Sequence, residues 1–99
     1  MSYTLVVYNT GDDDIAEAYS WYEQQKKGLG DEFLLALAEC CSRIFNYPHV
    51  FQLKHKHFRQ AGLKRFPYVV VYEIVKSKII IYSVFHTSRN PAKKFRKNR

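Results

Sequence analysis

The sequence predicts an α+β fold, in which an antiparallel pair of helices covers one face of a mainly antiparallel β-sheet. Three observations lead to this prediction: a strand-like run at the start, two segments with apolar residues at helical spacing, and two β-branched and aromatic runs near the end. The chain has 99 residues, enough for one domain that buries about 60 to 65% of the surface of the unfolded chain. We therefore expect a single hydrophobic core.

The first strand and the first helix are expected at the start of the chain. Residues 3–8 form a β-rich run, and Asn-Thr-Gly at 9–11 is typical of a turn. Three aspartates follow at 12–14, and carboxylates stabilise the positive, N-terminal end of a helix. Side chains at helical spacing follow: Ile15, Ala18, Tyr19 and Tyr22. We interpret the acidic triplet as a helix start and not as a metal site, because no further ligand is placed to complete one.

A second helix follows after a short glycine-containing link. Gly28 and Gly30 interrupt the pattern, Asp31 and Glu32 restart it, and Asn-Tyr-Pro at 46–48 ends it. So short a link predicts an antiparallel helical hairpin. The apolar stripe of this helix is predicted to comprise Phe33, Leu34, Leu37, Cys41 and Ile44. The neighbouring Cys40 and Cys41 are expected to be core thiols, since a disulfide between adjacent helical residues is disfavoured.

The rest of the sheet is expected in the second half of the chain. Residues 68–75 and 79–85 are separated only by Lys-Ser-Lys, which is typical of an antiparallel hairpin, and residues 58–63 favour a further strand. With the helices on one face of the sheet, we expect the charge on the other face. Regular alternation in the last strand predicts one apolar side with Ile80, Tyr82, Val84 and His86, and a second with Ile79, Ile81, Ser83 and Phe85. Two largely apolar sides predict a central strand, with polar chemistry at its end.

The charge of the chain is divided sharply between its two parts. Residues 1–49 have three Lys or Arg against eight acids, a net charge of −5, whereas residues 50–99 have thirteen against Glu73 alone, a net charge of +12. So basic a segment, interleaved with aromatic residues, favours a nucleic acid or another acidic partner. The alternative is a solvated basic surface that keeps a small protein soluble.

The end of the last strand offers two candidate catalytic residues. His86 is able to act as an acid or base near neutral pH, and Arg89 is able to hold a phosphate, a combination that suits RNA cleavage by a 2′-hydroxyl. In the structural alternative, His86 bonds a backbone group at the strand end and Arg89 pairs with an acid of the helices.

Three segments resemble the RelE/ParE superfamily of small toxins from bacterial type II toxin–antitoxin, or plasmid stabilisation, modules. They are GLGDEF at 28–33, LKRFPYVVVYEI at 63–74 and VFHTSRNP at 84–91, in the superfamily's order and spacing. The resemblance implies a strand, a helical hairpin and a curved sheet, with a basic groove and a cognate acidic antitoxin. It also implies a toxin domain at 1–92, with a basic tail at 93–99.

Within this superfamily the resemblance implies two modes of action. RelE-like members are ribosome-dependent mRNA endoribonucleases with an Arg directly after the Tyr that corresponds to Tyr68, whereas this chain has Val69. The His-x-x-Arg-x-Pro ending at 86–91 looks more like ParE, whose characterised members inhibit DNA gyrase without cutting RNA. We therefore favour a gyrase inhibitor, with the endoribonuclease as the alternative and a harmless RNA-binding domain as a third interpretation.

Each interpretation assigns roles to particular residues. As an endoribonuclease the chain would use His86, Arg89 and Arg65 for catalysis. Contacts with a nucleic acid or a protein partner are expected from Arg59, Lys64, Arg65, Lys93, Lys94, Arg96 and the off-stripe Trp21. No cofactor or metal is expected, because His55 and His57 lie among lysines and make a poor metal site. A cytoplasmic location is expected, as the sequence has no signal-peptide pattern and no membrane-length apolar run.

Overall fold

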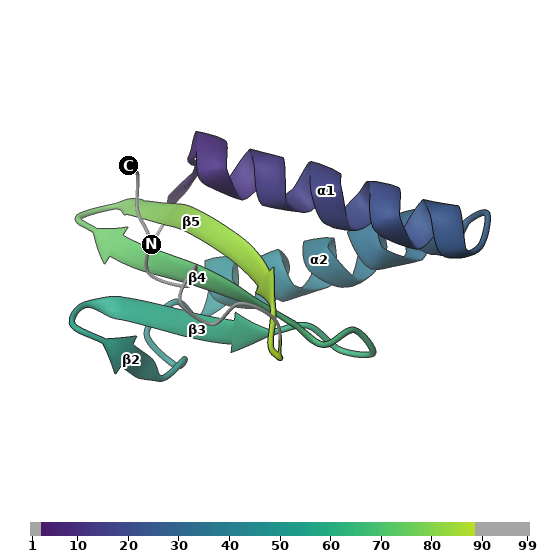
Figure 1. Ribbon diagram of the computed structural model, residues 1–99. Helices are drawn as coiled ribbons and strands as arrows, with labels where there is room; N and C mark the ends of the chain where they lie inside the picture. Colours follow the sequence, from purple (N-terminus) through teal and green to yellow (C-terminus); the bar gives the residue numbers. More distant parts are fainter. Residues whose placement is uncertain (1–2, 89–99) are drawn as a thin grey trace.

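The computed structural model describes residues 3–88, which form two helices and one five-stranded sheet (Figure 1). Strand order in the sheet is β1-β5-β4-β3-β2. The predicted α+β fold and the strand expected near residues 58–63 are both confirmed. The elements are β1 (Thr4–Val7), α1 (Asn9–Gln25), α2 (Leu29–Asn46), β2 (Leu53–His55), β3 (Phe58–Gly62), β4 (Tyr68–Val75) and β5 (Lys78–His86).

The sheet is mixed, although most of its pairs are antiparallel. β2, β3, β4 and β5 pair antiparallel in sequence, whereas β1 lies parallel to β5 with Val7 opposite Ile81. β5 therefore lies between β1 and β4, which confirms the prediction that it is central. The three-residue β2 was not predicted, because its side chains are exposed and lack an apolar alternation.

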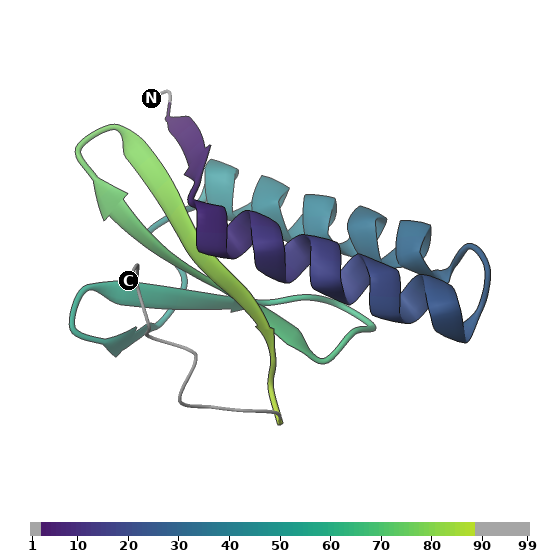
Figure 2. The same ribbon diagram turned by 45° about the horizontal axis from the view of Figure 1, so that its top comes forward.

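Both helices pack on the same face of the sheet and enclose the main core (Figures 1 and 2). From α2, the buried side chains are Phe33, Leu37, Cys40 and Ile44. The predicted stripe was wrong at Leu34, which is 37% exposed, and it omitted Cys40, which is completely buried; Cys41 is partly buried and packs against the core as predicted. Both cysteines are free thiols. Neither helix within residues 3–88 is long and apolar enough to cross a membrane.

A β-bulge in β5 changes which side chains face the helices. Tyr72 lies opposite Ile81 and Val71 opposite Ser83, so Tyr82 has no partner residue on β4. Beyond this point the predicted alternation is wrong: Val84 joins Ile81 in the main core, and Phe85 joins Tyr82 on the opposite face. The extra residue shifts the side-chain period by one position, which no pattern within a single strand reveals.

The first helix begins earlier than predicted. Asn-Thr-Gly at 9–11 forms its first turn, and α1 starts at Asn9 rather than at the aspartates. Gly11 lies so close to the sheet that an added Cβ would be 3.1 Å from Val7 Cγ1 and 3.4 Å from the Ile81 carbonyl oxygen. Tertiary packing at this contact overrides the local turn preference of the segment.

The sheet face away from the helices is largely apolar, although Glu73 of β4 also lies on it. A second cluster there contains Phe58, Val71, Tyr82 and Phe85, with Val69 and Ile80 packed against it. The expectation that this face carries the charge was therefore wrong. These side chains come from three adjacent strands, so apolar groups and not cations cover the middle of this face.

Candidate functional site

His86 ends β5 and is held by local contacts. It lies opposite Tyr68 of β4, with 5.3 Å between the ring centroids. Its Nδ1 accepts a hydrogen bond of 3.2 Å from the backbone N–H of Ser88, which leaves the proton of a neutral imidazole on Nε2. This geometry is the one expected for a structural role at the strand end. Arg89, its predicted catalytic partner, lies outside the described residues.

Arg65 lies in the loop between β3 and β4, near the same end of the sheet. Its Nη2 lies 2.8 Å from Glu32 Oε1 at the start of α2, and its guanidinium carbon lies 5.6 Å from the centroid of the Phe66 ring. The side chain is nevertheless 67% exposed, and exposed pairs of this kind contribute about 0 to 1 kcal/mol. Arg65 is therefore held by α2 but remains accessible to an anionic partner.

Two other predicted cations are also engaged within the chain. Lys64 Nζ lies 3.8 Å from Glu39 Oε2 on α2. Arg59 Nη1 donates hydrogen bonds to the carbonyl oxygens of Phe51 at 2.6 Å and His49 at 3.3 Å. Arg59 thus fastens the segment after α2 to β3, which gives it a structural contribution of its own. The structure does not bring Arg59 together with Arg65 and His86.

Trp21 packs against a neighbouring ring but is still partly exposed. It makes an edge-to-face contact of 5.1 Å with Tyr22, which itself stacks on Phe33 in the core at 5.5 Å. The residue is 46% exposed, as its position off the apolar stripe indicated. Lys93, Lys94 and Arg96, the remaining predicted binding residues, lie outside the described part of the chain.

Several exposed large apolar side chains on and after α2 were missed in the sequence. Leu35 is 72% exposed and Phe45 is 40% exposed on the helix, and Tyr47 and Val50 after it are 65% and 74% exposed. The available signal was Leu35 itself, which lies beside the apolar stripe and not within it. Large apolar side chains left exposed on a small protein are candidates for a contact with another macromolecule.

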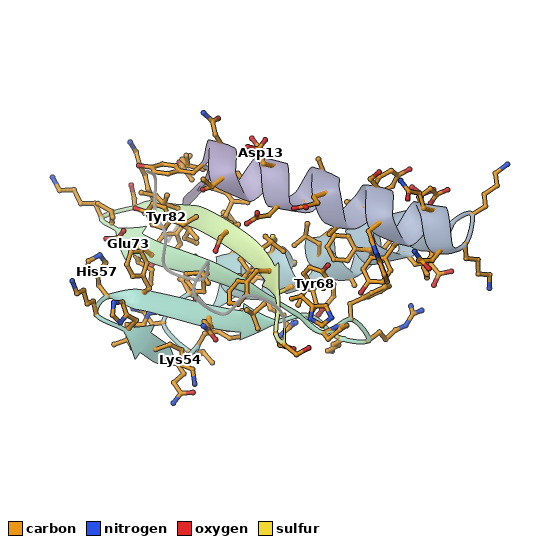
Figure 3. All side chains as sticks on the ribbon, viewed as in Figure 1. Asp13, Lys54, His57, Tyr68, Glu73 and Tyr82 are labelled. Carbon is orange, nitrogen blue, oxygen red and sulfur yellow. The ribbon has the colours of Figure 1, made fainter. Side chains whose placement is uncertain are left out.

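A hydrogen-bonded group on the open face of the sheet was also missed (Figure 3). Tyr82 donates its hydroxyl proton to Glu73 Oε1 at 2.7 Å, and His57 Nε2 lies 3.1 Å from Glu73 Oε2. Burial, together with the adjacent carboxylate, raises the pKa of Tyr82 above its ordinary value. Residues 3–88 contain no cluster of three or more His, Cys, Asp or Glu side chains placed to hold a metal ion.

A helical hairpin packed on one face of a sheet of order β1-β5-β4-β3-β2 is the fold expected of a small protein of the RelE/ParE class. Residues 9–91 match the family described as the ParE toxin of the type II toxin–antitoxin system parDE. The chain belongs to this ParE toxin family.

Individual relatives agree with this assignment. Toxin ParE2 of Mycobacterium tuberculosis, in strains CDC 1551 / Oshkosh and ATCC 25618 / H37Rv, is 33% identical over 92 residues, covering 92% of this chain and 88% of the relative. A solved chain described as the chromosomal ParDE TA system from P. aeruginosa superposes with a TM-score of 0.78. At 12% identity over 88% of this chain and 98% of that one, it supports the fold alone. The resemblance to RelE/ParE toxins is thus confirmed, and membership implies a cognate antitoxin.

Proposed function

We propose that this toxin acts in the cytoplasm as a non-catalytic inhibitor of DNA gyrase and that an acidic antitoxin silences it. The observation that supports this most is the apolar open face of the sheet. Cleavage of RNA requires cationic donors placed around the phosphate where charge develops. Val69 takes the position expected for such an arginine, and it packs against the cluster that contains Phe58, Val71 and Phe85.

The helical hairpin is the proposed contact with gyrase. Leu35 and Phe45 offer apolar area on α2, and Trp21 offers an exposed indole on α1. Tryptophan and large apolar side chains carry much of the binding energy in protein interfaces. The basic tail at 93–99 would add electrostatic steering toward an acidic or nucleic-acid-bound target.

An endoribonuclease remains the second candidate because of one contact. The hydrogen bond of 2.8 Å from the Thr87 N–H to the Pro67 carbonyl joins the strand end that carries His86 to the loop that carries Arg65. These two residues therefore share one end of the sheet, where Arg89 follows in the sequence. If this candidate were correct, Arg89→Ala would abolish toxicity without loss of the fold.

Gyrase supercoiling and transcript integrity distinguish the two candidates. We expect the purified chain to block supercoiling, Leu35→Glu to weaken the block at least tenfold, and Ala16→Glu, a matched charge on the exposed part of α1, to leave it nearly unchanged. Primer extension after induction should show intact transcripts. Codon-linked cuts that vanish in Arg89→Ala would overturn the gyrase proposal.

Co-purification tests the antitoxin. An acidic protein encoded beside this chain should elute with it at moderate salt and restore growth, because charge complementarity and apolar burial act together. If the two proteins separate and growth inhibition persists, this neighbour is not the antitoxin.

A further inference from the structure

Two hairpin turns bring four lysines to one end of the sheet. β3 and β4 are antiparallel with Arg59 opposite Tyr72, so the turn before β3 and the turn after β4 lie at the same end. Figures 1 and 2 both show these turns on the same side of the sheet, opposite the loop between β3 and β4. The four residues, here named the lysine end, are Lys54, Lys56, Lys76 and Lys78.

Nothing in the described part of the chain neutralises the lysine end. All four lysines are exposed, and no carboxylate within residues 3–88 lies within 4.0 Å of their ammonium groups. The acid of the nearby sheet, Glu73, is engaged by Tyr82 and His57 instead. By contrast, the loop at the opposite end of the sheet has Lys64 and Arg65 paired with acids of α2.

The backbone conformation of the two turns is a second, independent indication that the lysine end has a function. Lys56 has a φ of 54° and Lys76 a φ of 56°, so both hairpin tips place a lysine in the left-handed region. A glycine or asparagine suits such turn positions better, because the Cβ of other residues is crowded there. Both hairpin turns therefore have a charged lysine where glycine would be less strained. Strained positions of this kind occur at functional sites.

We propose that the lysine end binds the phosphate backbone of duplex DNA without reading its sequence. Lysines are flexible point charges that contact phosphates but do not specify bases. A duplex is favoured over a single strand, because residues 53–57 and 75–78 contain no Phe, Tyr or Trp on which unpaired bases would stack, and His57, one of the two histidines there, is engaged by Glu73. Leu53 and Val75 beside the lysine end are 50% and 38% exposed, whereas Val50 and Leu35, on or after α2, are 74% and 72% exposed. DNA is therefore favoured over an acidic protein, because a stable protein complex would bury the most exposed apolar side chains, and these lie elsewhere. This inference concerns the toxin alone and does not require gyrase as its target.

Fluorescence anisotropy with a labelled 20-base-pair duplex tests the proposal on the full chain. Lys56→Gln/Lys76→Gln should weaken binding about tenfold at low salt and reduce the slope of log affinity against log salt by about 1.8, the value for two lost phosphate contacts. Lys26→Gln/Lys27→Gln removes the same charge from the exposed link between the helices and should change the affinity less than threefold. The tail at 93–99 is the same in both variants and cancels in their comparison.

A second pair of substitutions tests the backbone argument. Lys56→Gly/Lys76→Gly should weaken DNA binding as much as the glutamine pair but raise the midpoint of thermal unfolding, because glycine relieves both left-handed positions. Equal losses of affinity in the hairpin and link variants would overturn the proposal, since they would reflect net charge alone. It would also be overturned by tighter binding to a labelled single-stranded RNA, or by hairpin variants that lose the antitoxin while keeping DNA.

Discussion

The carboxylate of Asp14 on α1 accepts a hydrogen bond of 3.1 Å from the backbone N–H of Val84 on β5. Pairing between β1 and β5 ends at Ile81, so the following part of the β5 edge needs other partners. The Thr10 hydroxyl supplies one by donating to the Tyr82 carbonyl oxygen at 2.6 Å. The first turns of α1 thus continue the edge pairing that β1 begins, and they do so where β5 bulges.

Removing the Asp14 carboxylate should destabilise the fold. We expect Asp14→Ala to lower the free energy of unfolding by about 1 to 3 kcal/mol, because the Val84 N–H would be left without this acceptor. Asp14→Asn should lose less, since its amide oxygen is still able to accept. Urea unfolding followed by circular dichroism measures both.

The exposed neighbour Asp13 provides the control for Asp14. Asp13→Ala removes the same charge from the same helix and should change stability by less than about 0.5 kcal/mol. Equal losses for Asp13→Ala and Asp14→Ala would show that helix charge, and not the bond to Val84, is responsible.

A methyl group at Gly30 should also destabilise the protein, because side chains of α1 pack closely against this position. An added Cβ would lie 2.7 Å from Tyr19 Cε1 and 2.8 Å from Glu23 Oε1. Glu23 already accepts hydrogen bonds from the N–H groups of Gly28 and Gly30 at the start of α2, so it is not free to move away. We expect Gly30→Ala to lose about 1 to 3 kcal/mol in thermal or urea unfolding.

Gly62→Ala is the matched control for Gly30→Ala. An added Cβ at Gly62 meets nothing within 4 Å, so its stability should stay within about 0.5 kcal/mol of the parent. A tolerated Gly30→Ala would mean that the helices separate easily, and it would remove the steric explanation.

Stability should fall at alkaline pH because of Cys40. Burial raises the pKa of its thiol from 9.0 to about 12, so the unfolded chain loses this proton first as the pH rises. The contribution of the protonated Cys40 thiol to the free energy of unfolding is complete below pH 9. Above pH 9 this contribution declines by about 1.4 kcal/mol per pH unit, until the pKa of the folded state is reached. When the pH is raised from 8 to 10.5, the free energy of unfolding of Cys40→Ala should therefore fall by about 2 kcal/mol less than that of the parent chain, as measured by urea unfolding.

Tyr72 shows why a comparison with the parent is needed for Cys40. Burial also raises the pKa of Tyr72 to about 12, and its hydroxyl donates to the Pro48 carbonyl oxygen at 2.7 Å. The Cys40→Ala chain should thus still lose stability at high pH, but less steeply. Identical pH profiles for the two chains would contradict an ionisation of Cys40 in this range.

Elements whose signals are local could be predicted from the amino-acid sequence alone. Helical spacing and the short link specified the hairpin of α1 and α2, and two β-branched runs around Lys-Ser-Lys specified β4 and β5. The sequence also placed His86 at a strand end and indicated an exposed Trp21, because both follow from position within a single element. Three short motifs in register were enough for the superfamily, which residues 9–91 confirm.

Features that depend on how distant segments align could be seen only in the three-dimensional structure. The bulge at Tyr82 arises from the register of β5 against β4, and the early start of α1 arises from its contacts with that bulge. Likewise Arg65 pairs with Glu32 at the surface, 33 residues away in the sequence. Lys56 and Lys76 share one end of the sheet, and no carboxylate among residues 3–88 pairs with them. Local propensity carries no information about register or pairing, because both are set by the packing of residues far apart in the chain.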